Sequence, residues 1–231
     1  MRSYAVLPLA IVALGCGRGA EGHCNLELPG WVCAPATGGG SVVLQPCLQG
    51  DGGNPPEPLA SPVQDGRCTV TGVIDTTVGY AGGSAATATY AQVTTETTGH
   101  AESVRVVYDP SKITYGTLLR IFFSVAHDPT ELNYQGPDVG TSYRSVIFYL
   151  NDDQQRIANA YIAQLDAAKV FKHRIVTQVT PLKGFYRAEE YHQDYALHNP
   201  DNPYILVCDR PKISELRKQF PDLFVDYTGK H

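Results

Sequence analysis

The sequence lacks three features that would place it in other classes of protein. No apolar run approaches the roughly 20 residues that a membrane-spanning helix needs. Charged residues make up only 18% of the chain, the net charge is -5, and there is no basic cluster. This argues against nucleic acid as a partner, because binding to phosphates depends on clustered Lys and Arg. No CxxC pair occurs, so the cysteine spacing gives little support to a zinc site.

What is present describes a globular protein with an unusual N-terminal part. The chain has 231 residues, 43% of them apolar, which is enough for one substantial domain and an additional segment. Five of the six cysteines lie in the first 68 residues, and the sixth is far from them: Cys16, Cys24, Cys33, Cys47, Cys68 and Cys208. Short secreted domains use such cysteines in disulfides, but here they precede a cysteine-poor body.

Residues 4–14 are continuously apolar and allow two interpretations. With Arg2 before them and Leu14-Gly15-Cys16 after them, they could form the signal segment of a secreted protein or lipoprotein. Alternatively, they form a buried strand that leads into an active-site turn. The residues that follow favour the strand.

The most informative stretch runs from Gly79 to Arg144 and contains several separate motifs. They are Gly79-Tyr80-Ala81-Gly82-Gly83, Thr89-Tyr90, Thr98-Gly99-His100-Ala101-Glu102, His127-Asp128-Pro129, and the run from Gln135 to Arg144. In this order and at this spacing, they resemble the peptide methionine sulfoxide reductase A family, whose members reduce the S epimer of methionine sulfoxide. The resemblance extends from about residue 72 to about residue 224.

The cysteine motif of this family has a partial counterpart near the N-terminus. The family motif reads Gly-Cys-Phe-Trp-Gly, often continued by Ala-Glu, whereas this chain has Gly15-Cys16-Gly17-Arg18-Gly19-Ala20-Glu21, and Leu28-Pro29-Gly30 follows. The resemblance implies that Cys16 is the nucleophile. Gly17 and Arg18 replace the two aromatic residues that, in the family, form the apolar wall for the substrate's methyl group. We therefore predict a poor reductase.

Residues 31–72 interrupt the resemblance. They are rich in Gly and Pro without a sustained period, which indicates a loop or linker. Removing them joins Leu28-Pro29-Gly30 to Val73-Ile74, which restores the family sequence Leu-Pro-Gly-Val at nearly its usual distance from the cysteine motif. We predict three parts: residues 1–30, a strand and degenerate nucleophile motif (or a signal segment); residues 31–72, a low-complexity insertion or linker; and residues 73–226, the reductase domain. The alternative is a true signal peptide and linker, with the catalytic segment lost.

The remaining chain predicts alternating strands and helices. Hydrophobic periodicity and capping residues predict strands at 73–78, 103–108, 145–150 and 175–179, and helices after Thr114, after Asn151 or Asp152, at 189–198 and at 213–220. Strands mixed with two longer helices indicate an α+β layered fold. The resemblance implies a ferredoxin-like two-layer α/β sandwich with long coil extensions and an irregular N-terminal insertion.

Reduction of a sulfoxide needs an attacking thiolate, an acid, and donors that hold the oxygen. Glu102 is the best acid candidate, because burial among apolar residues and glycines favours its protonated form. Tyr90 and Tyr143 match family tyrosines that point at the sulfoxide oxygen, and Asp138 matches an aspartate that helps to hold the acid and a water. Each also has an ordinary interpretation: a surface Glu, packed tyrosines, and a turn-forming Asp.

The cysteine chemistry would begin at Cys16. Attack by its thiolate would give methionine and a sulfenic acid, which a second thiol would resolve. Cys208 is a possible resolving residue, but Ile205-Leu206-Val207 before it suggest a strand that buries an unreactive thiol. The family's reductant is thioredoxin or a similar dithiol, and no bound cofactor is implied.

Together these observations predict an enzyme that reduces methionine-S-sulfoxide, free or in oxidised proteins, and thereby repairs oxidative damage. We expect a monomer that resides in the cytoplasm or an organelle and interacts with thioredoxin. If residues 1–16 are a signal, the protein is instead secreted or lipoprotein-anchored. The alternative function is that of a catalytically inactive family member that binds oxidised methionine without reducing it.

Overall fold

A computed structural model of the chain describes residues 68–226 and the two short segments 3–4 and 43–44. Cys16, the apolar run 5–14 and nearly all of residues 31–67 therefore lie outside the described residues. Within the described part, no helix is long and apolar enough to cross a membrane. The boundaries predicted at residues 30 and 72 remain predictions.

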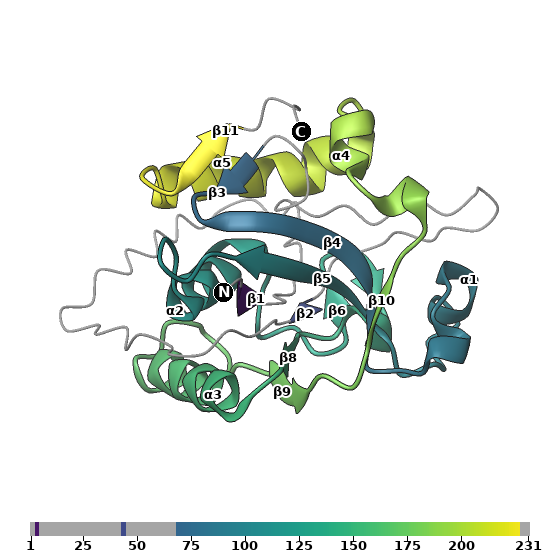
Figure 1. The fold of residues 1–231 in the computed structure, drawn as a ribbon, viewed down its shortest axis with the longest axis horizontal. Coiled ribbons are helices and arrows are strands. Elements are labelled where there is room, and N and C mark those ends of the chain that lie inside the picture. The colour runs from purple at the N-terminus through teal and green to yellow at the C-terminus, as the bar shows by residue number, and fades with distance from the viewer. Residues whose placement is uncertain (1–2, 5–42, 45–67, 227–231) are drawn as a thin grey trace.

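Two long strands form the centre of the sheet. They are β4 (Val73–Ala81) and β5 (Ala101–Tyr108), which pair antiparallel. The sheet order is β10-β4-β5-β2-β8-β9, and β1 also pairs with β5 (Figure 1). The other strands are β1 (Ser3–Tyr4), β2 (Val43–Leu44), β8 (Val146–Tyr149), β9 (Gln178–Pro181) and β10 (Phe185–Arg187). Only β8 and β9 pair in parallel among the described strands. The structure is thus a mixed α and β fold.

Two small sheets lie beside the main sheet. In one, β3 (Cys68–Val70) pairs with β11 (Phe224–Asp226), next to helix α5 (Arg210–Gln219) in Figure 1. In the other, β6 (Tyr134–Gln135) pairs with β7 (Asp138–Val139). Strand β3 lies on the insertion side of the boundary predicted at residue 72. Any shortening of the N-terminal part must therefore retain it.

The predicted strand at 103–108 is present but is more deeply buried than its alternating pattern suggests. Val104, Val106 and Tyr108 belong to the core, as expected for one buried face. Glu102 and Ser103 are inaccessible as well, and Arg105 alone is partly exposed. As a result, β5 carries a carboxylic acid deep inside the molecule, where a charge is costly.

Helices α2 and α3 begin at the predicted caps. The Thr114 hydroxyl accepts a hydrogen bond from the Thr117 N–H before α2 (Tyr115–Ile121), which continues as a π-helical turn, η2 (Phe122–Ala126). The Asn151 side chain accepts from the Gln154 N–H before α3 (Asp152–Ala167). The two helices pack against each other, and α3 lies against β8 and β9 (Figure 1). Local side-chain chemistry thus sets both helix starts.

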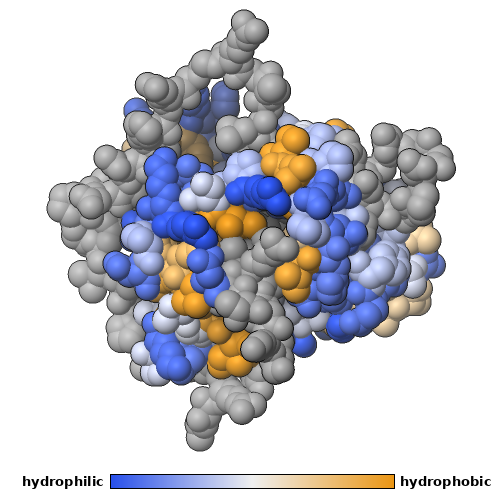
Figure 2. All heavy atoms as spheres, turned by 90° about the horizontal axis from the view of Figure 1, so that it is seen from above, coloured by the Kyte–Doolittle hydropathy of each residue, from blue (hydrophilic) through white to orange (hydrophobic). Residues whose placement is uncertain are grey.

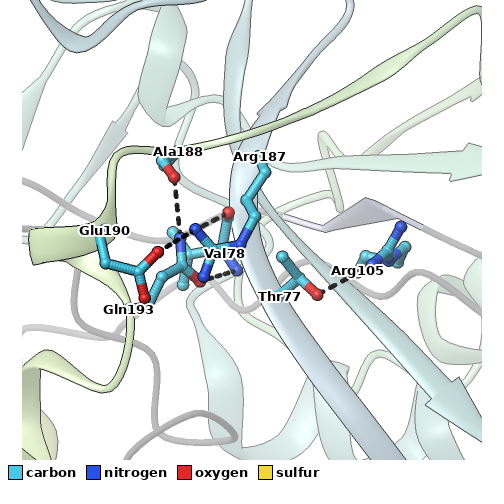
Figure 3. A network of polar contacts seen from close by, with 7 residues as sticks. All are labelled: Thr77, Val78, Arg105, Arg187, Ala188, Glu190 and Gln193. Carbon is cyan, nitrogen blue, oxygen red and sulfur yellow. Dashed lines mark hydrogen bonds and ion pairs between the residues drawn. The ribbon is translucent and has the colours of Figure 1, made fainter.

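The prediction of one helix over 189–198 is wrong. The segment forms a 3-10 turn, η4 (Glu190–His192), and a short helix, α4 (Tyr195–His198), separated by Gln193 in an extended conformation and Asp194 at φ 52°. The Gln193 side chain accepts a hydrogen bond from the Val78 N–H and donates to the carbonyl oxygens of Val78 and Ala188 (Figure 3). This attachment to β4 interrupts the helix.

The strand suggested by Ile205-Leu206-Val207 is also wrong. These residues start a π-helical turn, η5 (Ile205–Asp209), which continues into α5 (Arg210–Gln219) and makes that helix longer than the predicted 213–220. Ile205 and Cys208, three residues apart, are buried, whereas Leu206 and Val207 are 39% and 69% exposed. This one-sided burial is typical of a helix. Strand β9 also begins later than predicted, at Gln178.

The surface near α4 and α5 carries both hydrophobic and hydrophilic residues. Seen from the side on which these helices lie in Figure 1, hydrophobic residues form small areas separated by hydrophilic ones (Figure 2). Exposed hydrophobic side chains of the C-terminal segment include Leu206, Val207 and Val225. The visible described surface on this side therefore lacks a continuous apolar face.

His127 should make the protein less stable as the pH falls. It is fully buried, stacks on Phe122, donates from Nδ1 to the Phe122 carbonyl and has Nε2 2.7 Å from the Ser145 hydroxyl. Burial lowers the pKa of His127 from 6.5 to about 3. Between these values the unfolded chain binds a proton that the folded protein does not. His127 therefore lowers the free energy of unfolding by about 1.4 kcal/mol for each pH unit below 6.5.

The His127→Gln variant keeps an acceptor and a donor but cannot titrate. Its free energy of unfolding, measured by urea denaturation from pH 7 to pH 4, should fall less steeply than that of the wild type. Equal slopes in the two proteins would show that His127 does not cause this acid sensitivity.

Candidate active site

Glu102 is completely buried. It lies on β5 opposite Tyr80 of β4, and its side chain is 0% exposed. Neither carboxyl oxygen has a hydrogen-bond partner among the described residues. Burial raises the pKa of Glu102 well above its usual value, and the negative charges of Asp138 and Glu96 raise it further. Burial and these charges thus favour the protonated form of the carboxyl group.

Tyr90 and Tyr80 are held beside Glu102 by a second carboxylate. Tyr90 begins α1 (Tyr90–Val93), and its backbone N–H donates to Glu189 Oε1 at 2.9 Å. The Tyr80 hydroxyl donates to Glu189 Oε2 at 2.8 Å. Burial is the largest cause that raises the pKa of both phenols, so both keep their protons. Protonated phenols are hydrogen-bond donors, the role that the sequence predicts for Tyr90.

Glu189 itself was not found from the sequence. Its burial would raise its pKa, but the hydrogen bonds from the Tyr90 N–H and the Tyr80 hydroxyl, together with nearby His192, lower it overall. The charged form of Glu189 is therefore favoured, whereas the protonated form of Glu102 is favoured. The pKa values of two carboxyl groups near the same tyrosines are thus shifted in opposite directions.

Asp138 lies on β7 and is 3% exposed. Its Oδ2 accepts a hydrogen bond of 3.1 Å from the Tyr204 hydroxyl. The charge of Asp138 raises the pKa of Glu102 and of Tyr90, which places these three predicted residues within electrostatic reach of one another. Tyr204 was missed, because a single Tyr among 14 has no distinguishing pattern in the sequence.

Tyr143 is buried at the end of a 3-10 turn, η3 (Thr141–Tyr143), which packs against β5. Its neighbours are tied to the segment that precedes Glu102. The Ser142 N–H donates to Glu96 at 2.7 Å, and the Arg144 guanidinium donates to the carbonyl oxygens of Gly99 and His100. The turn therefore brings Tyr143 beside the strand that carries Glu102.

His100 holds the glycine-rich turn between β4 and η1 (Ala85–Thr87). Its Nδ1 accepts from the Gly83 N–H at 3.3 Å, and its Nε2 lies 2.9 Å from the Ser84 carbonyl oxygen, to which it donates. A Cβ atom at Gly83 would lie 2.5 Å from the ring, so only glycine permits this contact. Burial lowers the pKa of His100, which keeps the ring neutral. Its role is structural support of the turn.

Cys208 is buried and makes no disulfide. Burial raises the pKa of the Cys208 thiol; Lys212 lowers it, and the charges of Asp209 and Asp138 raise it further. A thiol of this kind is a poor nucleophile, because the thiolate is the reactive form. Cys16, predicted as the nucleophile, lies outside the described residues, so its position remains a prediction.

Comparisons with known proteins identify a family that matches most of the described chain. A family model for peptide methionine sulfoxide reductase matches residues 63–223. The chain is 54% identical to peptide methionine sulfoxide reductase MsrA 2 of Mesorhizobium japonicum over 155 residues, which cover 67% of this chain and 80% of that protein. It is 50% identical to MsrA 2 of Synechocystis sp. over 153 residues, covering 66% and 72% of the two chains.

A solved structure has a similar arrangement. The reduced form of Mxr1 from Saccharomyces cerevisiae is 36% identical, with a TM-score of 0.53, and the match covers 57% of this chain and 74% of that one. The family match contains Tyr90, Glu102, Asp138 and Tyr143, and it begins at residue 63, after Cys16.

Proposed function

The chain belongs to the peptide methionine sulfoxide reductase family, and we propose how its buried carboxyl site carries out the thiol-dependent reduction of methionine sulfoxide. The observation that carries the proposal is Glu102. It is a fully buried carboxyl group whose two oxygens have no hydrogen-bond partner among the described residues, and burial raises its pKa well above the usual value. Such a group is unfavourable unless a ligand completes it, and it is suited to donate a proton.

Substrate binding would use the protonated phenols. We assign to Tyr90 and Tyr143 the donation of hydrogen bonds to the sulfoxide oxygen, which carries partial negative charge. Glu189 accepts from the Tyr90 N–H and the Tyr80 hydroxyl and so fixes the start of α1. Donors fixed before the substrate arrives stabilise developing charge without reorganising during the reaction.

In the chemical step, a thiolate attacks the sulfur of the sulfoxide while Glu102 gives its proton to the oxygen. The hydroxyl then moves to the cysteine sulfur while the bond between the two sulfurs and the original sulfur–oxygen bond break, yielding methionine and a cysteine sulfenic acid, Cys–S–OH. The proton balance closes because the attacking thiol's own proton restores Glu102. The negative charge of Asp138 favours the protonated form of Glu102 between turnovers.

Cys16 is our candidate for the nucleophile. A second thiol would condense with its sulfenic acid, giving a disulfide and water, and a dithiol such as thioredoxin would reduce that disulfide. We also propose oxidised proteins or free methionine sulfoxide as the substrates, a monomer, and a cytoplasmic or organellar location. Packing of α2 and α3 against each other and of α3 on the sheet supports a ferredoxin-like two-layer core.

The test is thioredoxin-coupled reduction of a peptide that contains methionine-S-sulfoxide, with the R epimer as the matched control. We expect methionine to form from the S epimer only. Binding of the S-sulfoxide peptide without any methionine formation would instead support the inactive binding protein. Failure to bind either epimer would contradict both assignments.

Restoring the aromatic wall should improve the enzyme. The double substitution Gly17→Phe with Arg18→Trp should raise kcat/KM, because two apolar rings would receive the substrate's methyl group in place of a guanidinium that resists burial. Each well-packed ring contributes roughly 0.5–1.5 kcal/mol beyond its buried area, so a gain of about tenfold is expected. Arg18→Lys, which retains the charge, is the control and should give no gain. An unchanged kcat/KM in the double variant would show that residues 17 and 18 do not face the substrate.

A further inference from the structure

Glu96 has an unfavourable backbone conformation, and its side-chain carboxylate accepts several hydrogen bonds. It follows α1 and has a φ of 61°, in the left-handed region that residues with a Cβ rarely adopt. Its N–H closes the turn on the Val93 carbonyl at 3.0 Å. A strained residue persists where the surrounding contacts fix its conformation.

The hydrogen bonds accepted by the Glu96 carboxylate and its backbone carbonyl all come from the turn that carries Tyr143. The Glu96 carboxylate accepts from the Ser142 N–H at 2.7 Å, the Ser142 hydroxyl at 2.5 Å and the Thr141 hydroxyl at 3.0 Å. The Glu96 backbone carbonyl accepts a further bond from Thr141 at 3.3 Å. Gly140 makes this approach possible, because a Cβ atom there would lie 2.4 Å from the Glu96 carboxyl carbon.

Arg144 makes the reverse connection. Its guanidinium donates to the carbonyl oxygens of Gly99 at 3.0 Å, His100 at 3.1 Å and Thr141 at 2.8 Å. The segment 96–100, which leads into Glu102, and the segment 140–144 are thus joined from both sides. Tyr143 lies between the two residues that make these connections, Ser142 and Arg144.

We propose that Glu96 is a positioning residue, which fixes the Tyr143 turn against the strand that carries Glu102. This inference rests on the proposed function of Tyr143 and Glu102. The carboxylate accepts from three donors at once, which no uncharged side chain of similar size does as strongly. Without it, the turn would lose its anchor on one side of Tyr143. A displacement of about 1 Å in a substrate-holding group lowers turnover by as much as 10²-fold.

The test variant is Glu96→Gly. Glycine tolerates the left-handed conformation, so the variant removes the carboxylate without adding backbone strain. We expect kcat for a methionine-S-sulfoxide peptide to fall about 10- to 100-fold, with a smaller change in KM. Glu96→Gln, which keeps one acceptor oxygen, should recover part of the loss.

The matched control is Lys169→Gly. Lys169 also has a left-handed φ, 50°, and follows the C-terminal end of α3. It faces a groove lined by Asp166, Phe171 and Arg174 and is not part of the site. This variant should leave kcat unchanged. A similar loss in both variants would indicate a general effect of glycine, and would overturn the proposal.

A double-mutant cycle separates positioning from other effects. If Glu96 acts through Tyr143, adding Glu96→Gly to Tyr143→Phe should lower kcat by less than about threefold, because the coupled group is already absent. Full additivity of the two losses would contradict the proposal.

Hydrogen exchange gives a readout that does not depend on turnover. The Ser142 and Tyr143 amides should exchange faster in Glu96→Gly than in the wild type, while amides of α3 should not change. Unchanged exchange at Ser142 would overturn the proposal even in an inactive chain. Faster exchange together with a wild type that neither binds nor reduces the peptide would refute the proposed function and leave the anchoring role of Glu96 intact.

Discussion

The Glu102→Gln variant should reduce methionine-S-sulfoxide about 10²–10⁴-fold more slowly than the wild type. Glutamine keeps the shape of the side chain, but its amide cannot deliver a proton to the departing oxygen. The dissociation constant for the sulfoxide peptide should change much less, because the phenols of Tyr90 and Tyr143 still donate to the oxygen. The comparison of kcat with peptide affinity, measured by isothermal titration, checks both parts.

The same variant should differ from the wild type in its pH dependence. The pKa of Glu102 is raised well above 4.5, and the proposed acid role needs the protonated form. The wild-type rate should therefore fall as the pH rises through that pKa, and the Gln variant should lack this decline. The free energy of unfolding should change in the same direction. The folded protein holds a proton that the unfolded chain releases above pH 4.5, so Glu102 lowers stability as the pH rises.

Glu102→Gln should consequently raise the melting temperature at pH 8 while lowering activity. Glu190→Gln is the matched control, because Glu190 is an exposed carboxylate near the site that pairs with Arg187. It should leave kcat unchanged. Wild-type turnover in the Glu102→Gln enzyme would remove Glu102 from the acid role.

The Cys16→Ser variant should lose reductase activity to the background of the assay. A serine hydroxyl is far less nucleophilic than a thiolate and cannot accept the oxygen as a sulfenic acid. The measurement is methionine formed per enzyme in a single turnover without reductant, followed by thioredoxin-coupled turnover. Peptide binding should persist, since the residues that hold the oxygen are unchanged.

Cys208→Ala separates the two possible roles of thiols. Its buried thiol has a raised pKa, so the first turnover should be unaffected by its removal. A loss confined to repeated turnover would assign resolution to Cys208. Full activity in Cys16→Ser would show that another cysteine is the nucleophile and that the interpretation of residues 1–30 is wrong.

Local sequence determined the features that depend on neighbouring residues. The Thr114 and Asn151 caps bond to N–H groups three residues further on, so a short motif suffices to predict them. The core stripe of α2 and the central strands follow from hydrophobic periodicity. The predicted site residues Tyr90, Glu102, Asp138 and Tyr143 came from motifs of a known family, and each is buried in the structure.

Tertiary structure alone decided the features that depend on distant partners. Glu189 bonds to Tyr90 across 99 positions of sequence, Tyr204 to Asp138 across 66, and Glu96 to Ser142 across 46. The break at Gln193 has the same origin, because its side chain bonds to Val78, 115 residues away. Propensity acts over one or two turns of chain, whereas these contacts exist only once the sheet has brought its strands together. For that reason the sequence could supply the candidate acid and donors, whereas only the fold shows which distant residues contact them.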